Sequence, residues 1–134
     1  MSAGTSDMRP GNPYAADCPT RQLLDRIGDR WTVLIIGALS DGPLRYTALA
    51  TRIEAISQKM LTQTLRALER DGIVVRTVLP VIPPHVEYEL SSLGSDLLAT
   101  VSVLERWAIT HIQDVESARR TFDANAKAQA SPAR

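Results

Sequence analysis

Apolar side chains recur with helical spacing at Leu61, Leu65 and Leu68, which predicts a helix with one buried side. Ser57 carries a hydroxyl that can accept hydrogen bonds from the unpaired amides of a first helical turn. Gly72 tolerates the left-handed backbone with which many helices end. The pattern therefore predicts a helix that begins after Ser57 and ends before Gly72.

The opposite side of this predicted helix is polar, and most of its charges are positive. Such side chains donate hydrogen bonds to phosphates and to the edges of guanine and adenine. The candidate DNA-binding residues here are Ser57, Gln58, Lys59, Thr62, Gln63, Arg66 and Arg70. Taken alone, the pattern fits an ordinary solvated helix equally well. The choice between a solvated helix and a DNA-binding helix therefore depends on the neighbouring elements.

Three shorter helices are predicted before this one. The first opens at Cys18-Pro19 and ends at Gly28, because proline is favoured at a first helical position. The second covers Arg30–Ser40 and is apolar on nearly all sides, which is typical of a buried helix. The third covers Arg45–Ile53. A short helix, a tight turn and a helix with a polar outer side are the parts of a helix-turn-helix.

After Gly72 the pattern changes to that of strands. Residues 73–79 and 85–90 are rich in β-branched or alternating side chains, and a loop with three prolines joins them, so a β-hairpin wing is predicted. A long helix capped by Ser91 or Ser92 follows. It carries two apolar patches, which predicts one contact with its own domain and one with a partner. The expected fold is mainly α with a small β-hairpin, a winged helix-turn-helix domain flanked by N- and C-terminal dimerisation helices.

Length and composition set the domain organisation. A chain of 134 residues predicts one domain. We expect a flexible leader over residues 1–17, the winged helix-turn-helix and dimerisation domain over 18–116, and a frayed or disordered tail over 117–134. The formal net charge is zero, so nucleic-acid binding must rest on local placement of charge. No apolar run is long enough to span a membrane and no signal peptide is evident, so a cytoplasmic protein is expected.

The order of these parts resembles the HxlR-type family of bacterial winged helix-turn-helix regulators, from Cys18 to about Ile112. The stretches that carry the resemblance are Cys18-Pro19, Ile27–Trp31, Asp41–Tyr46, Ile56–Leu65 with Leu68–Gly72, and Pro83–Ser91. The resemblance implies homodimers on palindromic operator DNA, with the recognition helix in the major groove and the wing on the flanking backbone. It assigns wing contacts to Arg76 and His85, although many relatives seem to have arginine where this chain has His85.

The resemblance also bears on Cys18, the one cysteine of the chain. Family members include redox and electrophile sensors with a cysteine at this position. The positive end of the helix dipole and nearby Arg21 would favour a thiolate at Cys18. An oxidant, an electrophile or another small ligand would then be the effector. The other interpretation, that Cys18 only caps the helix or packs near a dimer interface, stays open.

The predicted dimer contacts lie on the first and last helices. They are Leu23, Leu97, Val101, Leu104, Trp107 and Ala108.

Other classes of function are less well matched. No glycine-rich phosphate loop, nucleophile motif or paired carboxylates point to an enzyme, and no cofactor is expected. His85 and His111 lie far apart without other metal-ligand spacing, so no metal site is predicted. The alternatives are a MarR-like ligand-responsive regulator and a winged-helix module for protein–protein assembly.

Overall fold

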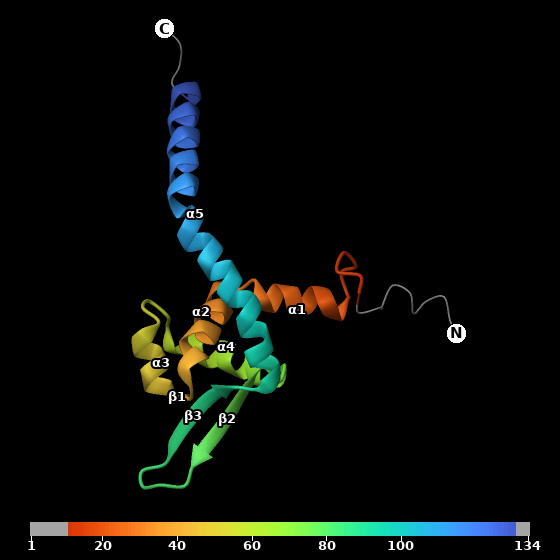
Figure 1. Ribbon diagram of the computed structural model, residues 1–134, viewed down its shortest axis with the longest axis vertical. Helices are drawn as coiled ribbons and strands as arrows, with labels where there is room; N and C mark the ends of the chain where they lie inside the picture. Colours follow the sequence, from red (N-terminus) through yellow and green to blue (C-terminus); the bar gives the residue numbers. More distant parts are fainter. Residues whose placement is uncertain (1–10, 131–134) are drawn as a thin grey trace, which may run out of the picture. The chain divides into compact units, whose positions relative to one another are not determined.

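The computed structural model describes residues 11–130. Its elements are α1 (Pro19–Ile27), α2 (Arg30–Ala38), the 3₁₀ turn η2 (Leu39–Asp41), β1 (Leu44–Arg45), α3 (Tyr46–Arg52), α4 (Gln58–Arg70), β2 (Val74–Leu79), β3 (His85–Leu90) and α5 (Ser92–Ala130) (Figure 1). The chain divides into two compact units, Met1–Ala99 and Thr100–Arg134, and α5 runs from the first into the second. The winged helix-turn-helix predicted from the sequence is present.

The first two helices begin where the sequence predicts. Cys18 is the N-cap of α1, Pro19 is the first helical residue and Gly28 is the C-cap. Asp29 caps α2 and accepts from the backbone amide of Trp31 at 2.8 Å. The first amides of a helix have no partner inside it. Asp29 supplies an acceptor for those of α2, and Pro19 has no amide that would need one.

Helix α2 is less uniformly buried than its sequence predicts. Its buried residues are Thr32, Ile35, Ile36 and Ala38. Leu34 is exposed, because a helix packed on one side still leaves its far side in solvent. Ile35, Ile36 and the neighbouring Leu39 form the centre of the core.

The wing is the β2–β3 hairpin, and it belongs to a three-stranded antiparallel sheet with strand order β1-β3-β2. The β2–β3 hairpin is confirmed and extends away from α2 and α4 (Figure 1). Strand β1, which pairs Leu44 with Tyr88 and Arg45 with Glu87, was not predicted. Two residues are too few for an alternating pattern, and they directly follow the turn at Pro43.

Helix α4 forms as predicted. The Ser57 hydroxyl accepts from the Met60 amide at 3.0 Å. Leu61, Leu65 and Leu68 are all buried. Burial of a leucine side chain contributes about 1.5–3 kcal/mol, so these three residues fix which side of α4 faces the core.

The end of α4 is a Schellman motif. The Ile73 amide donates to the Leu68 carbonyl at 2.9 Å, and the Gly72 amide donates to the Glu69 carbonyl at 3.0 Å. Gly72 has φ +76°, which a side chain would strain. This motif turns the chain from α4 directly into β2.

The start of α5 is tied to the same turn. The Ser91 hydroxyl donates to the Ile73 carbonyl and accepts from the Gly94 amide at 3.0 Å, which makes Ser91 the cap. A Cβ at Gly94 would lie 2.1 Å from the Ile73 carbonyl oxygen, so only glycine permits this close approach. The end of α4 and the beginnings of β2 and α5 are thus held together.

Both predicted flexible ends differ in part from expectation. Helix α5 continues to Ala130, whereas the sequence predicted fraying past Ser117. Alanine, arginine, lysine and glutamine are strong helix formers and dominate this stretch, so local propensity extends the helix. Residues 11–17 of the leader form turns with two backbone hydrogen bonds. The rest of the predicted leader and tail, residues 1–10 and 131–134, lies outside the described residues. None of the described helices combines the length and apolarity needed to cross a membrane.

Candidate nucleic-acid interface

The polar side of α4 faces solvent. All seven residues predicted for DNA contact on this helix and its cap are exposed: Ser57, Gln58, Lys59, Thr62, Gln63, Arg66 and Arg70. The side chains therefore point away from the leucine-lined core side. This orientation is set by the buried leucines and by the caps at the two ends of α4.

Tyr46 on α3 fixes how α4 is held. Its hydroxyl donates to the Gln58 carbonyl at 3.0 Å and pairs with the Thr62 hydroxyl, also at 3.0 Å. Thr62 was predicted as a phosphate contact, and the structure gives it a second role inside the protein. The Tyr46 hydroxyl links the two helices of the helix-turn-helix at the first turns of α4.

A hollow of about 420 Å³ lies between α4 and the wing. It is lined by Thr62, Arg66, Glu69, Arg76 and Tyr88 and is called the α4–wing hollow below. It brings together three residues predicted from the sequence, of which two are arginines. The carboxylate of Glu69 in the same hollow offers an acceptor beside the guanidinium donors, so the site can both donate and accept hydrogen bonds.

The two predicted wing residues do not share this site. Arg76 pairs in register with Tyr88, whereas His85 pairs with Leu79. Side chains alternate between the faces of a strand, so Tyr88 and His85, three residues apart on β3, point to opposite faces. Arg76 therefore shares the face of Tyr88 toward the α4–wing hollow, and His85 does not.

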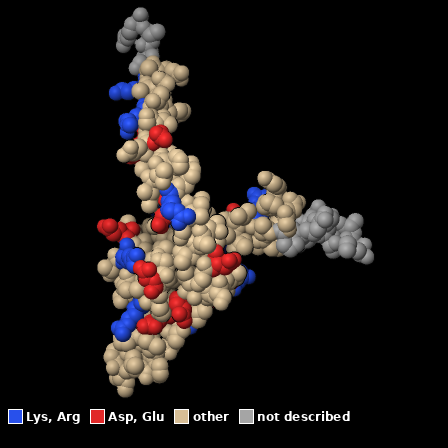
Figure 2. Space-filling view, viewed as in Figure 1, with Lys and Arg blue, Asp and Glu red and all other residues tan. Residues whose placement is uncertain are grey.

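Charge on the wing is sparse. Between Val74 and Leu90 the sequence holds one arginine, Arg76, and two carboxylates, Glu87 and Glu89. In Figure 2 positive and negative side chains alternate over the first unit, and the tip of the hairpin carries neither. A contact with phosphates from the wing would rest on Arg76.

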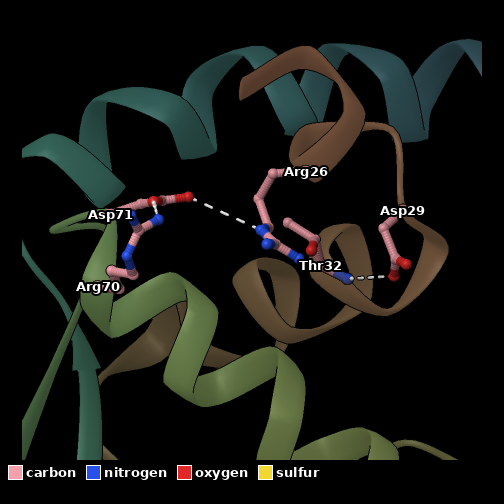
Figure 3. Close-up of polar contacts among 5 residues, drawn as sticks. All are labelled: Arg26, Asp29, Thr32, Arg70 and Asp71. Carbon is pink, nitrogen blue, oxygen red and sulfur yellow. Dashed lines mark hydrogen bonds and ion pairs between the residues drawn. The ribbon is translucent and has the colours of Figure 1, made fainter. Parts of the chain in front are cut away.

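The far end of α4 has a different environment. Arg70 lies 4.0 Å from a carboxylate oxygen of Asp71, the C-cap of α4. The other carboxylate oxygen lies 3.7 Å from Nε of Arg26, which reaches across from the last turn of α1 (Figure 3). Arg70 thus belongs to a small charge cluster outside the α4–wing hollow.

Cys18 is fully buried, and its backbone amide donates to the carbonyl of Ala15 in the preceding turn at 3.1 Å. Burial raises the pKa of its thiol, but hydrogen bonds from the backbone of Arg21 and Thr20, the Thr20 hydroxyl and the Asn12 backbone outweigh it, so the pKa lies below its usual value. The sequence predicted a favoured thiolate from the helix dipole together with the nearby Arg21. In the structure the contribution of Arg21 is a backbone hydrogen bond.

The predicted dimer residues divide into two groups. Leu23, Leu104, Trp107 and Ala108 are exposed, and Leu97 is half-buried. Val101 is only 1% exposed within the single chain, so it offers little surface to a partner. Val101 fits a heptad-like spacing of residues along α5 with Leu97, Leu104 and Ala108, but spacing alone does not separate contacts within a chain from contacts between chains.

Three residues of the site were not predicted. Glu69 follows Arg66 by three residues, a spacing that places both on one side of a helix, so it could have been found. Tyr88 required the hairpin register, and the role of the Tyr46 hydroxyl required the packing of α3 on α4. Among residues 11–130, no group of three or more histidine, cysteine, aspartate or glutamate side chains could hold a metal ion.

Comparison with known proteins is consistent with this geometry. The sequence model of a family described as HxlR-like helix-turn-helix matches residues 26–116. The chain is 40% identical over 115 residues to "Uncharacterized HTH-type transcriptional regulator YtfH" of Escherichia coli (strain K12), covering 86% of this chain and 91% of that protein.

Two solved structures are also similar. That of a transcriptional regulator, ytfH from Salmonella typhimurium, has a TM-score of 0.77 and 42% identity and covers 82% of this chain and 98% of its own. "Redox regulator HypR in its oxidized form" has a TM-score of 0.65 and 38% identity, with coverage of 69% and 96%.

Proposed function

The chain belongs to the HxlR-like helix-turn-helix family of transcriptional regulators, and we propose that it binds a palindromic DNA operator sequence-specifically as a homodimer. The observation that carries this proposal is the exposed polar side of α4, with Arg66 facing Arg76 of the wing across one hollow. Two guanidinium groups from different elements converge where a nucleic-acid backbone and base edges could be contacted together.

The roles follow from the reach and chemistry of each side chain. The 13 residues of α4 span about 20 Å at ~1.5 Å per residue, enough to cross a major groove. Gln63 and Arg66 are assigned to base edges, because glutamine suits adenine and arginine suits guanine with paired hydrogen bonds. Lys59, Thr62 and Arg76 are assigned to phosphates.

The homodimer is supported by apolar surface. Leu23 and Leu24 on α1 are exposed, as are Leu104, Trp107 and Ile109 on α5. Exposed apolar surface of this extent marks a site of association more often than a solvated surface. In the proposed dimer these side chains contact a second copy of the chain.

The similar proteins are named as regulators, which supports a protein that acts by binding rather than by catalysis, in the cytoplasm with its DNA.

For Cys18 we propose a redox or electrophile response, supported by the lowered pKa of its thiol and by similarity to a protein titled a redox regulator. Since the thiol is buried, reaction requires a local opening that exposes it first.

Selection of bound DNA from a random pool tests the main proposal. We expect enrichment of an inverted repeat whose half-sites are spaced by about one helical turn, roughly 34–36 Å, or a multiple of it. Lack of enrichment with both reduced and diamide-treated protein would contradict sequence-specific binding.

The Cys18 response has its own test. Diamide or quinone treatment should change the affinity of the wild type for the selected DNA and leave that of Cys18→Ser unchanged. An equal response of the two proteins would remove Cys18 from the mechanism.

A further inference from the structure

We propose that Arg26 is a positioning residue for DNA recognition, because its ion pair with Asp71 holds the C-terminal end of α4 against α1. This inference rests on the proposed function of α4. It adds a residue outside the α4–wing hollow, on α1 rather than on α4 or the wing. Figure 3 shows Arg26 reaching from α1 to Asp71 at the end of α4.

The position of Asp71 creates the need for a cation. A carboxylate at a helix C-cap lies at the negative end of the helix dipole, which is unfavourable unless positive charge is close. Two arginines supply it, Arg26 at 3.7 Å and Arg70 at 4.0 Å. The stability of the last turn of α4 therefore depends on these arginines.

The two arginines are not equivalent. The Arg70 side chain is 87% exposed, so solvent and salt screen its attraction strongly. The side chains of Arg26 and Asp71 are 39% and 26% exposed, and the screening between them is weaker. Arg70 also belongs to α4 itself, so of these two arginines Arg26 is the one that links the end of α4 to another helix.

The Arg26 side of the pair depends on Asp71 as well. Nε of Arg26 is shielded from solvent and makes no hydrogen bond among the described residues. The carboxylate of Asp71 is the charge that offsets this burial. Loss of either partner leaves the other in an unfavourable place, which makes the pair sensitive to substitution on both sides.

The ion pair lies where a change in it would affect the recognition of DNA. Asp71 directly precedes Gly72 and Ile73, the residues that turn the chain from α4 into β2. A shift at this point moves the end of α4 and the root of the strand that carries Arg76. The expected consequence is a change in selectivity between DNA sequences, since base contacts depend more on alignment than phosphate contacts do.

The variants for the test are Arg26→Gln, Asp71→Asn and the double variant, with Arg21→Gln as matched control. Arg21 is an exposed arginine on the same helix whose hydrogen bond to Cys18 is made by its backbone, so its substitution removes the same charge without removing the pair or that bond. Arg26→Lys keeps the charge and serves as rescue. Affinities are measured for the selected operator and for random DNA at several salt concentrations.

We expect Arg26→Gln and Asp71→Asn each to reduce the ratio of operator to random affinity by roughly threefold to tenfold. The double variant should lose no more than either single variant, because the two losses share one interaction. Arg21→Gln should keep the wild-type ratio, and Arg26→Lys should recover most of it. The salt dependence of DNA affinity should be the same for Arg26→Gln as for the wild type, because a positioning residue makes no phosphate contact.

Amide hydrogen exchange without DNA separates this inference from the proposed function. Exchange at residues 70–73 should be faster in Arg26→Gln than in Arg21→Gln. If the wild type shows no preference for any DNA, the proposed function fails. Amide hydrogen exchange then tests by itself whether the ion pair stabilises the end of α4. Unchanged exchange, or an unchanged affinity ratio in a wild type that is selective, would overturn the inference.

Discussion

Helices α4 and α5 are both amphipathic, but they use their apolar sides differently. In α4 the apolar residues Leu61, Leu65 and Leu68 are buried inside one chain, and the exposed side is polar. In α5 large apolar side chains such as Trp107 and Phe122 remain exposed. One helix is fully packed within the single chain, and the other is not.

The contrast indicates two kinds of partner. An exposed side made of lysine, arginine, glutamine and threonine matches a polar, anionic surface such as DNA. Exposed large apolar side chains match another apolar surface, and a second copy of the same chain supplies one. Recognition of DNA and association of subunits are thus assigned to different helices.

Truncation of a leucine in each helix should separate the two roles most strongly. Leu65→Ala removes a fully buried side chain from α4 and should lower the free energy of unfolding by about 2–5 kcal/mol. Leu104→Ala removes an exposed side chain from α5 and should cost much less at low protein concentration. Chemical denaturation measures both, and equal losses would contradict the distinction.

Trp107→Ala should weaken the homodimer rather than the fold. Trp107 is 57% exposed, and large aromatic anchors at interfaces contribute about 2 kcal/mol or more, which corresponds to a loss of roughly 30-fold in dimer affinity. Sedimentation equilibrium gives the dissociation constant, with Arg106→Ala as a neighbouring exposed control. A dimer constant equal to that of the control would remove Trp107 from the interface.

Much of this contrast follows from the sequence. Spacing located the leucines of α4, and Ser57 and Gly72 marked its ends, because caps act through local hydrogen bonds and backbone angles. The heptad-like spacing of apolar residues along α5 could not show that Val101 is buried whereas Leu104 is exposed. That distinction depends on what packs against each residue, and a repeat does not contain it.

The site itself was predictable only where one helix determines it. The periodicity of α4 predicted which of its residues face outward. The roles of Tyr46 and Tyr88, and the separation of Arg76 from His85, depend instead on how different elements pack and pair. The helical stretch past Ser117 was not predicted, although the alanine, arginine, lysine and glutamine that dominate it are strong helix formers.

Tyr46→Phe tests the role of α3 in holding α4. The variant removes the hydroxyl that contacts the Gln58 carbonyl and Thr62, and one such hydrogen bond contributes about 0.5–1.5 kcal/mol. We expect a loss of stability of that size and a modest loss of operator affinity. Thr62→Val, which removes the second hydroxyl, should add little to Tyr46→Phe; full additivity in unfolding experiments would argue against their contact.

Ionisation of Cys18 gives the smallest expected effect. Its pKa is lowered, so thiolate absorbance near 240 nm should appear with a midpoint below the usual ~8.5, with Cys18→Ser as the blank. Because the unfolded chain then binds more protons between the two pKa values, stability relative to Cys18→Ser should rise with pH through that interval and be lost as the pH falls below the folded pKa. A midpoint at or above the usual value would contradict the hydrogen-bonded thiolate.

The central claim is that the polar side of α4 reads DNA, and one titration series tests it directly. Arg66→Ala and Lys59→Ala are compared with the wild type on selected and random DNA over a range of salt concentrations. We predict that Arg66→Ala loses about 1–3 kcal/mol on the selected sequence and much less on random DNA. Lys59→Ala should lose affinity equally on both and show a shallower salt dependence. Equal losses on both DNAs for both variants, or no loss for either, would contradict the claim.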